Sequence, residues 1–138
     1  MNKEFIPYEQ AIELKELGFD KPCFGYYYTT NGKDWQFAEK SEYYRLDDEI
    51  NIGSKFSLSA PTFSQAFRWF REKYNLLGNV YSNASGWLWE IHDNIGGTHR
   101  FGSEWSGDCE ESGMFTSFEK AELECLIKLI EIVKENKQ

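Results

Sequence analysis

The sequence predicts an α+β fold: one antiparallel sheet of about five to six strands with helices packed on one face. The expected order is helix–hairpin–strand–helix–hairpin–helix. Three observations lead to this prediction. Three segments carry apolar residues at helical spacing, several others alternate apolar and polar residues, and aromatic residues make up 17% of the 138 residues. A chain this aromatic can bury enough surface to fold as a single globular domain over residues 1–138.

The first predicted helix covers residues 7–17. Pro7 suits the first helical position, where its missing N–H is not needed. Apolar residues recur on one side of the segment and charged residues on the other. Gly18 is expected at the left-handed position after the helix, with Phe19 folded back on Leu14.

A hairpin is predicted next, with strands over residues 24–30 and 33–38 joined by the two-residue turn Asn31-Gly32. This turn sets the register and pairs Tyr28 with Trp35. Tyr27 falls on the wetter face. The opposite face is expected in the core and carries Phe24, Tyr26, Tyr28, Trp35 and Phe37.

Residues 39–53 are expected to form a loop, with a short strand near Tyr43 and an acidic triplet at 47–49. A third strand is predicted over residues 55–60, and Pro61 ends it. The second helix begins at Thr62, which forms a capping box with Gln65. Its core stripe consists of Phe63, Ala66, Phe67, Phe70 and Tyr74.

Two further strands, 79–82 and 86–93, are expected around a short loop, and residues 98–101 are expected to return as another strand. Trp87, Trp89 and Ile91 alternate with more polar neighbours, so one face of this hairpin is expected in the core. Residues 102–113 are predicted to be an acidic loop that contains Trp105.

The last helix is predicted over residues 116–134, with Thr116 and Glu119 as a second capping box. Apolar side chains cover most of its circumference. Such a helix is central in a core or covered by a partner chain. A homodimer through the last helix is therefore expected.

Two short segments, 62–66 and 117–121, share Phe and Ala at matching positions, and each opens a helix after a β-rich region. The single domain can therefore also be divided into two hairpin-plus-helix units, about 23–77 and 79–135. Two explanations stay open: a duplication, or a pattern that any strand-to-helix junction favours.

Composition excludes several classes of protein. Lys and Arg number 15 against 23 Asp and Glu, so the formal charge is −8, and direct nucleic-acid binding is not expected. No apolar run approaches the roughly 18 residues of a membrane span, and the N-terminus lacks the apolar core of a secretory signal. The cysteines at 23, 109 and 125 form no C-x-x-C pair. We expect a cytoplasmic protein without disulfides or membrane contact.

No catalytic motif is present for phosphate binding, metal hydrolysis or a nucleophilic serine. His92 and His99 are the only histidines. They match no zinc spacing, so no metal and no cofactor are expected. Paired carboxylates such as Glu90 and Asp93 would need a pocket that shifts one pKa. No catalytic residue is assigned, and the sequence favours a protein that is not an enzyme.

Aromatic residues exceed what one core takes. The chain has 11 Phe, 8 Tyr and 5 Trp, whereas a domain of this size encloses about ten to twelve large rings. Excess Tyr and Trp favour interfaces. Residues 78–138 also hold 5 Lys or Arg against 11 Asp or Glu, a net −6, and such a field could imitate nucleic acid toward a basic partner. The predicted binding residues are Tyr27, Tyr43, Tyr44, Trp105, Asp108, Glu110 and Glu111.

Three stretches carry a family resemblance. They are residues 5–23, beginning Phe5-Ile6-Pro7-Tyr8, residues 60–74, with Pro61-Thr62-Phe63-Ser64-Gln65-Ala66-Phe67, and residues 121–131. Together they resemble a family of short proteins encoded by phages, prophages and mobile elements of gut Bacteroidetes. The resemblance implies a phage or mobile-element origin and a cytoplasmic setting. It transfers no site residue, cofactor or activity.

The leading functional hypothesis is a non-enzymatic protein-interaction domain that binds a host protein and modulates a host process. One alternative is a binding module for a small nucleotide-like ligand, which would use the aromatic sheet face with Arg68, Arg71 or Arg100. The other alternative is a small hydrolase with paired carboxylates or with the two histidines.

Overall fold

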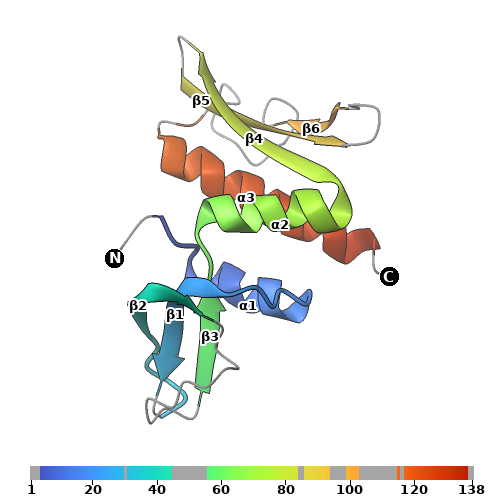
Figure 1. The fold of residues 1–138 in the computed structure, drawn as a ribbon. Coiled ribbons are helices and arrows are strands. Elements are labelled where there is room, and N and C mark those ends of the chain that lie inside the picture. The colour runs from blue at the N-terminus through green and yellow to red at the C-terminus, as the bar shows by residue number, and fades with distance from the viewer. Residues whose placement is uncertain are drawn as a thin grey trace. The chain divides into compact units, whose positions relative to one another are not determined.

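The computed structural model describes residues 4–29, 31–44, 56–83, 86–93, 99–102, 115 and 117–136, and it describes their side chains except at 40–44, 56, 57, 83, 93 and 99–102. Figure 1 shows the elements in chain order: α1 (Tyr8–Glu16), β1 (Cys23–Thr29), β2 (Gln36–Tyr44), β3 (Phe56–Ala60), α2 (Phe63–Tyr74), β4 (Leu76–Asn83), β5 (Gly86–Asp93), β6 (His99–Gly102) and α3 (Phe118–Asn136). The α+β class is confirmed. The strand expected over residues 98–101 is β6, which the expected order of elements left out between the second hairpin and the last helix.

The expectation of a single sheet is wrong. The described strands form two antiparallel sheets of three strands each, in the orders β2-β1-β3 and β4-β5-β6. The chain likewise divides into two compact units, Met1–Gln65 and Ala66–Gln138, whereas the sequence placed the division near residue 78. The first strand is central in the first sheet and the second strand is central in the other, so the two units do not repeat one topology. Their action as one domain stays a prediction.

In the first unit, helix α1 ends as predicted. Gly18 has a φ of 101°, its N–H bonds to the carbonyl of Lys15 (3.0 Å), and the N–H of Phe19 bonds to the carbonyl of Leu14 (2.9 Å). This is the paired hydrogen-bond pattern of a glycine-terminated helix, as predicted. Pro7 is the N-cap residue itself, with a φ of −65° and a ψ of 160°, so α1 begins one residue later than expected.

The β1–β2 register differs by one residue from the prediction. Tyr28 pairs with Gln36, and Tyr27 pairs with Phe37. The connection is not a two-residue turn, because Asn31 organises a longer one. Its Oδ1 accepts hydrogen bonds from the N–H groups of Lys33 (2.8 Å) and Asp34 (3.0 Å). An Asx turn of this kind competes with the type I′ turn that Asn-Gly favours.

The burial of β1 differs from the prediction at Tyr27 and Phe24, whereas Tyr26 is buried as expected. Tyr27 is 3% exposed, whereas Phe24, expected in the core, is 38% exposed. Gly25 explains the choice of face: a Cβ added there would lie 2.7 Å from two ring carbons of Phe5. The N-terminal segment therefore packs, through Phe5, against the face of β1 that carries Gly25. Both faces are aromatic, so alternation alone could not distinguish them.

Helix α2 begins at the predicted cap, since Thr62 Oγ1 accepts a hydrogen bond from the N–H of Gln65 (3.1 Å). The capping box is incomplete, because the Gln65 side chain donates instead to the carbonyl of Pro22 (2.6 Å). The helix ends at Tyr74, and Asn75 reverses the chain with a φ of 57°. Strand β4 therefore begins at Leu76, three residues earlier than expected.

In the second unit, α3 packs against β4 and β5 (Figure 1). The rings of Trp87 and Phe118 meet edge to face at 5.3 Å. Residue Gly78 faces the helix, since a Cβ added there would lie 3.0 Å from Leu129 Cδ1 and 3.1 Å from Cys125 Sγ. Ser117 Oγ accepts a hydrogen bond from the N–H of Lys120 (3.2 Å), and the predicted cap residue Thr116 lies outside the described residues.

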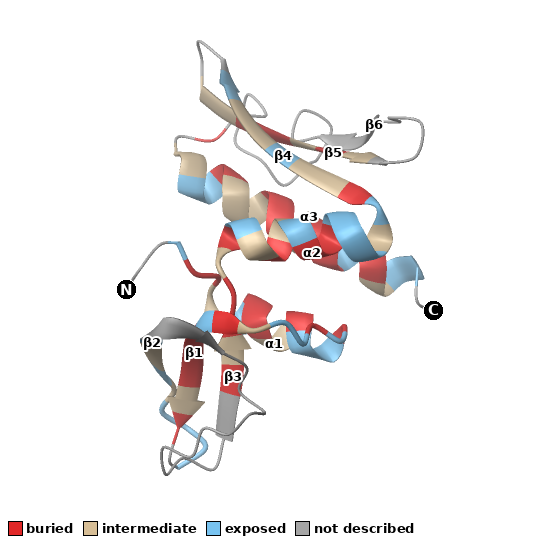
Figure 2. Cartoon of the chain, viewed as in Figure 1, coloured by how far each residue is buried: buried red, intermediate tan, exposed pale blue. Residues whose placement is uncertain are grey.

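Buried residues line much of α3 (Figure 2). Leu126, Leu129, Ile130, Ile132 and Val133 are each at most 3% exposed in the single chain. A second copy is therefore not needed to cover them, which removes the sequence-based reason for a dimer through this helix. Among the described helices, none combines the length and apolar character that crossing a membrane requires.

Candidate functional site: the outer edge and outer face of the second sheet

Tyr27, one of the predicted binding residues, is a core residue. Its hydroxyl donates a hydrogen bond to the carbonyl of Ile6 (2.8 Å, buried). Its ring lies 5.4 Å from that of Phe37 and 5.6 Å from that of Tyr8. The one-residue register difference and the approach of the N-terminal segment place it inside the first unit. Tyr27 is therefore not part of the surface of this unit.

The other predicted binding residues are not brought together by the described parts of the chain. Tyr43 and Tyr44 lie in β2, where Tyr44 pairs with Cys23, and their side chains fall outside the description. Also outside the described residues are Trp105, Asp108, Glu110 and Glu111. Their role in binding, and the imitation of nucleic acid by acidic loops, stay predictions.

The edges of the two sheets differ in how they are protected against pairing with another chain. Natural edge strands are protected by short length, charge, proline or a bulge. Strand β2 carries Glu39, Lys40 and Glu42, and its pairing with β1 has a register shift. Strand β3 has five residues and is followed by a proline. Strand β6 has four residues, one of them Arg100, and also has a register shift.

Strand β4 has none of these protections. Its eight residues, Leu-Leu-Gly-Asn-Val-Tyr-Ser-Asn, include no charge and no proline. All eight pair with β5 without a register shift. Within the described sheet β4 has one neighbouring strand, β5. Its second edge is therefore the longest regular, uncharged edge of the described strands.

The outer face of this sheet is the face opposite α3. Because Gly78 faces α3, the alternate residues Leu77, Asn79 and Tyr81 lie on the outer face. Leu77 and Tyr81 are half-buried, and Asn79 is exposed. On β5 their partners are His92, Glu90 and Leu88. The edge thus presents a polar residue between two apolar ones.

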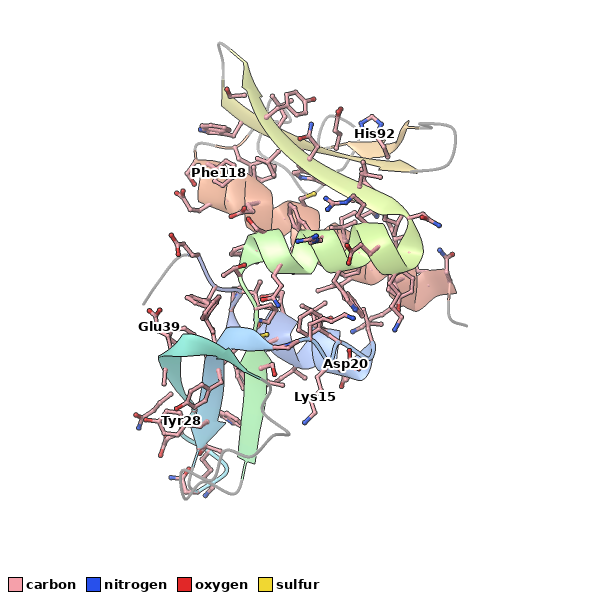
Figure 3. All side chains as sticks on the ribbon, in the orientation of Figure 1. Lys15, Asp20, Tyr28, Glu39, His92 and Phe118 are labelled. Carbon is pink, nitrogen blue, oxygen red and sulfur yellow. The ribbon has the colours of Figure 1, made fainter. Side chains whose placement is uncertain are left out.

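The side chains of Glu90 and His92 are hydrogen-bonded to each other on the same outer face. The distance from Glu90 Oε2 to His92 Nε2 is 2.8 Å, and the two side chains are 22% and 32% exposed. Figure 3 labels His92 on β5. The backbone pairs His92 with His99 of β6. The two histidines therefore occupy directly opposite register positions, which their sequence spacing did not predict.

The buried thiols of Cys23 and Cys125 have low reactivity, because burial raises the pKa of each. Burial raises the pKa of Cys23 to about 12, and a hydrogen bond to Ser59 opposes the rise. Burial likewise raises the pKa of Cys125 above its usual range, against an opposing hydrogen bond from the Asn79 backbone. A thiol of this kind holds its proton at neutral pH and is a poor nucleophile. Neither thiol is a candidate catalytic group.

One described carboxyl group, that of Glu122, has a raised pKa. Burial, aided by the charge of Glu119, raises the pKa of Glu122 to about 7. Its carboxylate lies on α3. Among the described side chains, no three of His, Cys, Asp and Glu gather into a site for a metal ion. For the small-ligand alternative, Arg68 is engaged with Glu72 (3.2 Å) on the exposed side of α2.

Sequence reasoning missed the β4 edge. A signal was present, since residues 74–89 contain no charged residue, but alternation identifies a strand without showing which edge stays unpaired.

No family model, no curated protein and no solved structure matches this chain.

Proposed function

We propose that this chain is a non-enzymatic protein-interaction domain of a phage or mobile element, and that an extended segment of a host protein adds as a strand to the outer edge of β4. One observation carries the proposal: β4 is eight residues long, uncharged, without proline and paired without a register shift. Edges of this kind pair with other chains unless they are protected. The family resemblance supports a host protein as the partner.

The residues of the β4 edge indicate which kind of partner segment would fit it. Backbone hydrogen bonds supply affinity in strand addition, and alternate side chains supply selectivity. Apolar residues opposite Leu77 and Tyr81 would extend the half-buried outer face, and a polar residue would lie opposite Asn79. The chain carries a formal charge of −8, which disfavours acidic segments. The proposed segment is extended, non-acidic and apolar at alternate positions.

Hydrogen exchange of the free chain tests the open edge. In an antiparallel pair, alternate residues of an edge strand direct their N–H groups toward the neighbour and the others direct them away. We expect alternate amides of β4 to exchange rapidly in D₂O, while amides of the central strand β5 exchange slowly. Uniformly slow exchange along β4 would overturn the proposal, because it would show that the edge is already covered.

Selection from a library of random linear peptides tests the binding itself. We expect recovered peptides to slow the exchange of the rapidly exchanging β4 amides. Asn79→Lys places a charge on the edge, as natural protected edges do, and is expected to weaken peptide binding at least about tenfold. The matched control is Gln36→Lys, which adds the same charge at an exposed position of β2 and is expected to leave binding unchanged. Protection that maps elsewhere, or equal loss in both variants, would contradict the proposal.

Self-association is measured on the same variants. The expected homodimer through α3 is a separate proposal, and its remaining apolar contacts would be the half-buried residues Leu123 and Ile127. Light scattering at increasing concentration distinguishes the two surfaces. A dimer abolished by Asn79→Lys would place a second copy on β4 and overturn the host-segment proposal, whereas a dimer abolished by Ile127→Lys alone would assign self-association to α3.

A further inference from the structure

Glu90 is the only acidic residue on the outer face within the described pairing of β4 with β5. It lies directly opposite Asn79, so the two side chains stand beside each other on that face. On its other side the backbone pairs Glu90 with Gly102, a residue without a side chain. A strand added to the free edge of β4 would place its own side chain next in this row, beyond Asn79.

The outer face is accessible at Glu90 and closed further along β5. Leu88, two residues earlier in the strand, is fully buried, whereas the side chains of Glu90 and His92 are partly exposed. On β4, Asn79 is exposed. A side chain of an added segment can therefore reach this face at the level of Asn79 and Glu90.

His92 holds the Glu90 carboxylate in position. The distance from His92 Nε2 to Glu90 Oε2 is 2.8 Å, which is a short hydrogen bond. A carboxylate offers about four acceptor positions on its two oxygens, and this bond occupies one of them. A group that is already held in place loses less conformational freedom when it binds a partner. The Glu90 carboxylate is therefore suited to accept a further hydrogen bond from a cationic donor.

A segment added to β4 would cover this carboxylate. Neighbouring strands lie about 4.8 Å apart, so the residue opposite Asn79 would have its Cα about 9.6 Å from that of Glu90. An extended Lys or Arg side chain and the Glu90 side chain together span this distance. Covering a carboxylate without a counter-charge costs free energy, because the charge loses water. Lys and Arg avoid this cost, since their apolar stems can pack over Asn79 while their charged ends reach Glu90.

Resting on the proposed strand addition, we propose that the residue of the host segment opposite Asn79 is Lys or Arg and that it forms an ion pair with Glu90. The segment then carries an apolar residue opposite Leu77, a basic residue opposite Asn79 and an apolar residue opposite Tyr81. Glu90 is the specificity-determining residue. The backbone of β4 would accept many extended segments, and the covered carboxylate disfavours those that bring no positive charge.

The probes are library peptides that slow the exchange of β4 amides. In each peptide, every Lys or Arg is replaced in turn by norleucine, which keeps an apolar stem and removes the charge. We expect one replacement to weaken binding to the parent chain about fivefold and to change binding to the Glu90→Gln chain less than about twofold. Glutamine keeps an acceptor for His92, and amide spectra check that the variant is folded.

The matched control is Glu135→Gln, which removes the same charge from an exposed position of α3 and is expected to keep the fivefold preference. Salt at about 1 M is expected to reduce the preference in the parent chain, because it screens an ion pair near the surface. Peptides that protect β4 without a basic residue of this kind would overturn the role of Glu90 and leave strand addition standing. Loss of the preference in both variants would also overturn it, since net charge would then explain the selectivity. Peptides that bind without protecting β4 would overturn both proposals.

Discussion

Replacing Glu122 by glutamine should stabilise the protein at alkaline pH and have little effect at acidic pH. Glu122 lies half-buried on α3, and burial raises its pKa from an ordinary 4.5 to about 7, with the charge of Glu119 adding to the rise. The folded chain therefore binds more protons than the unfolded chain between these two values. By linkage, the stabilising contribution is complete below pH 4.5 and is lost as pH rises through 7.

The magnitude follows from the two pKa values. They differ by about 2.5, and each pKa unit corresponds to about 1.36 kcal/mol, which gives at most about 3.4 kcal/mol. The side chain is only half-buried, so solvent screening reduces this to about 1–2 kcal/mol. Glutamine has nearly the same shape and no charge. We therefore expect the variant to exceed the parent chain in free energy of unfolding by about 1–2 kcal/mol at pH 8.

Urea denaturation at pH 5 and pH 8, followed by helical circular dichroism, measures this difference. The matched control is Glu135→Gln on an exposed position of the same helix, which is expected to change the free energy of unfolding by less than about 0.5 kcal/mol. An equal effect of Glu122→Gln at both pH values, or destabilisation at pH 8, would refute the reasoning. Either result would show that the carboxylate is as well solvated in the folded chain as in the unfolded one.

Three further predictions concern the interiors of the two units. Tyr27→Phe should lower the free energy of unfolding by about 1–2 kcal/mol, because it leaves the buried carbonyl of Ile6 without its donor; an unchanged urea midpoint would mean that Tyr27 is a surface residue after all. Gly25→Ala should cost about 1–3 kcal/mol, because the new Cβ would lie 2.7 Å from the Phe5 ring, and a neutral result would show that the ring can move away. Burial raises the pKa of Cys125 above its usual range, so mass spectrometry should find it alkylated only as fast as the chain unfolds, and rapid labelling in the folded state would contradict this.

Several features of the fold could be read from neighbouring residues. The left-handed Gly18 and the Thr62 cap follow from contacts within one helical turn, and the structure confirms both. Local signals failed where two of them competed. At residues 31–34 the dipeptide Asn-Gly favours a two-residue turn, but the Asn31 side chain forms an Asx turn that lengthens the loop and moves the register by one residue.

The candidate sites depended on which strands pair. Alternation identified β4 as a strand, but only the pairing with β5 showed that its other edge has no neighbour among the described strands. The aromatic excess pointed to Tyr27, which the structure buries. His92 and His99 match no zinc spacing as a sequence, yet a bulge sets them opposite each other.

By itself the sequence determined the α+β class and the approximate positions of the helices and most strands, because these depend on hydrogen bonds and side-chain periodicity within a few residues. Tertiary structure alone decided that there are two sheets, which side chains of β1 are buried, that β4 has one neighbour among the described strands, and that the backbone pairs His92 with His99. Each of these outcomes depends on hydrogen-bond and packing partners supplied from elsewhere in the chain. Residues close in the sequence do not specify which distant segment will pair with them or pack against them.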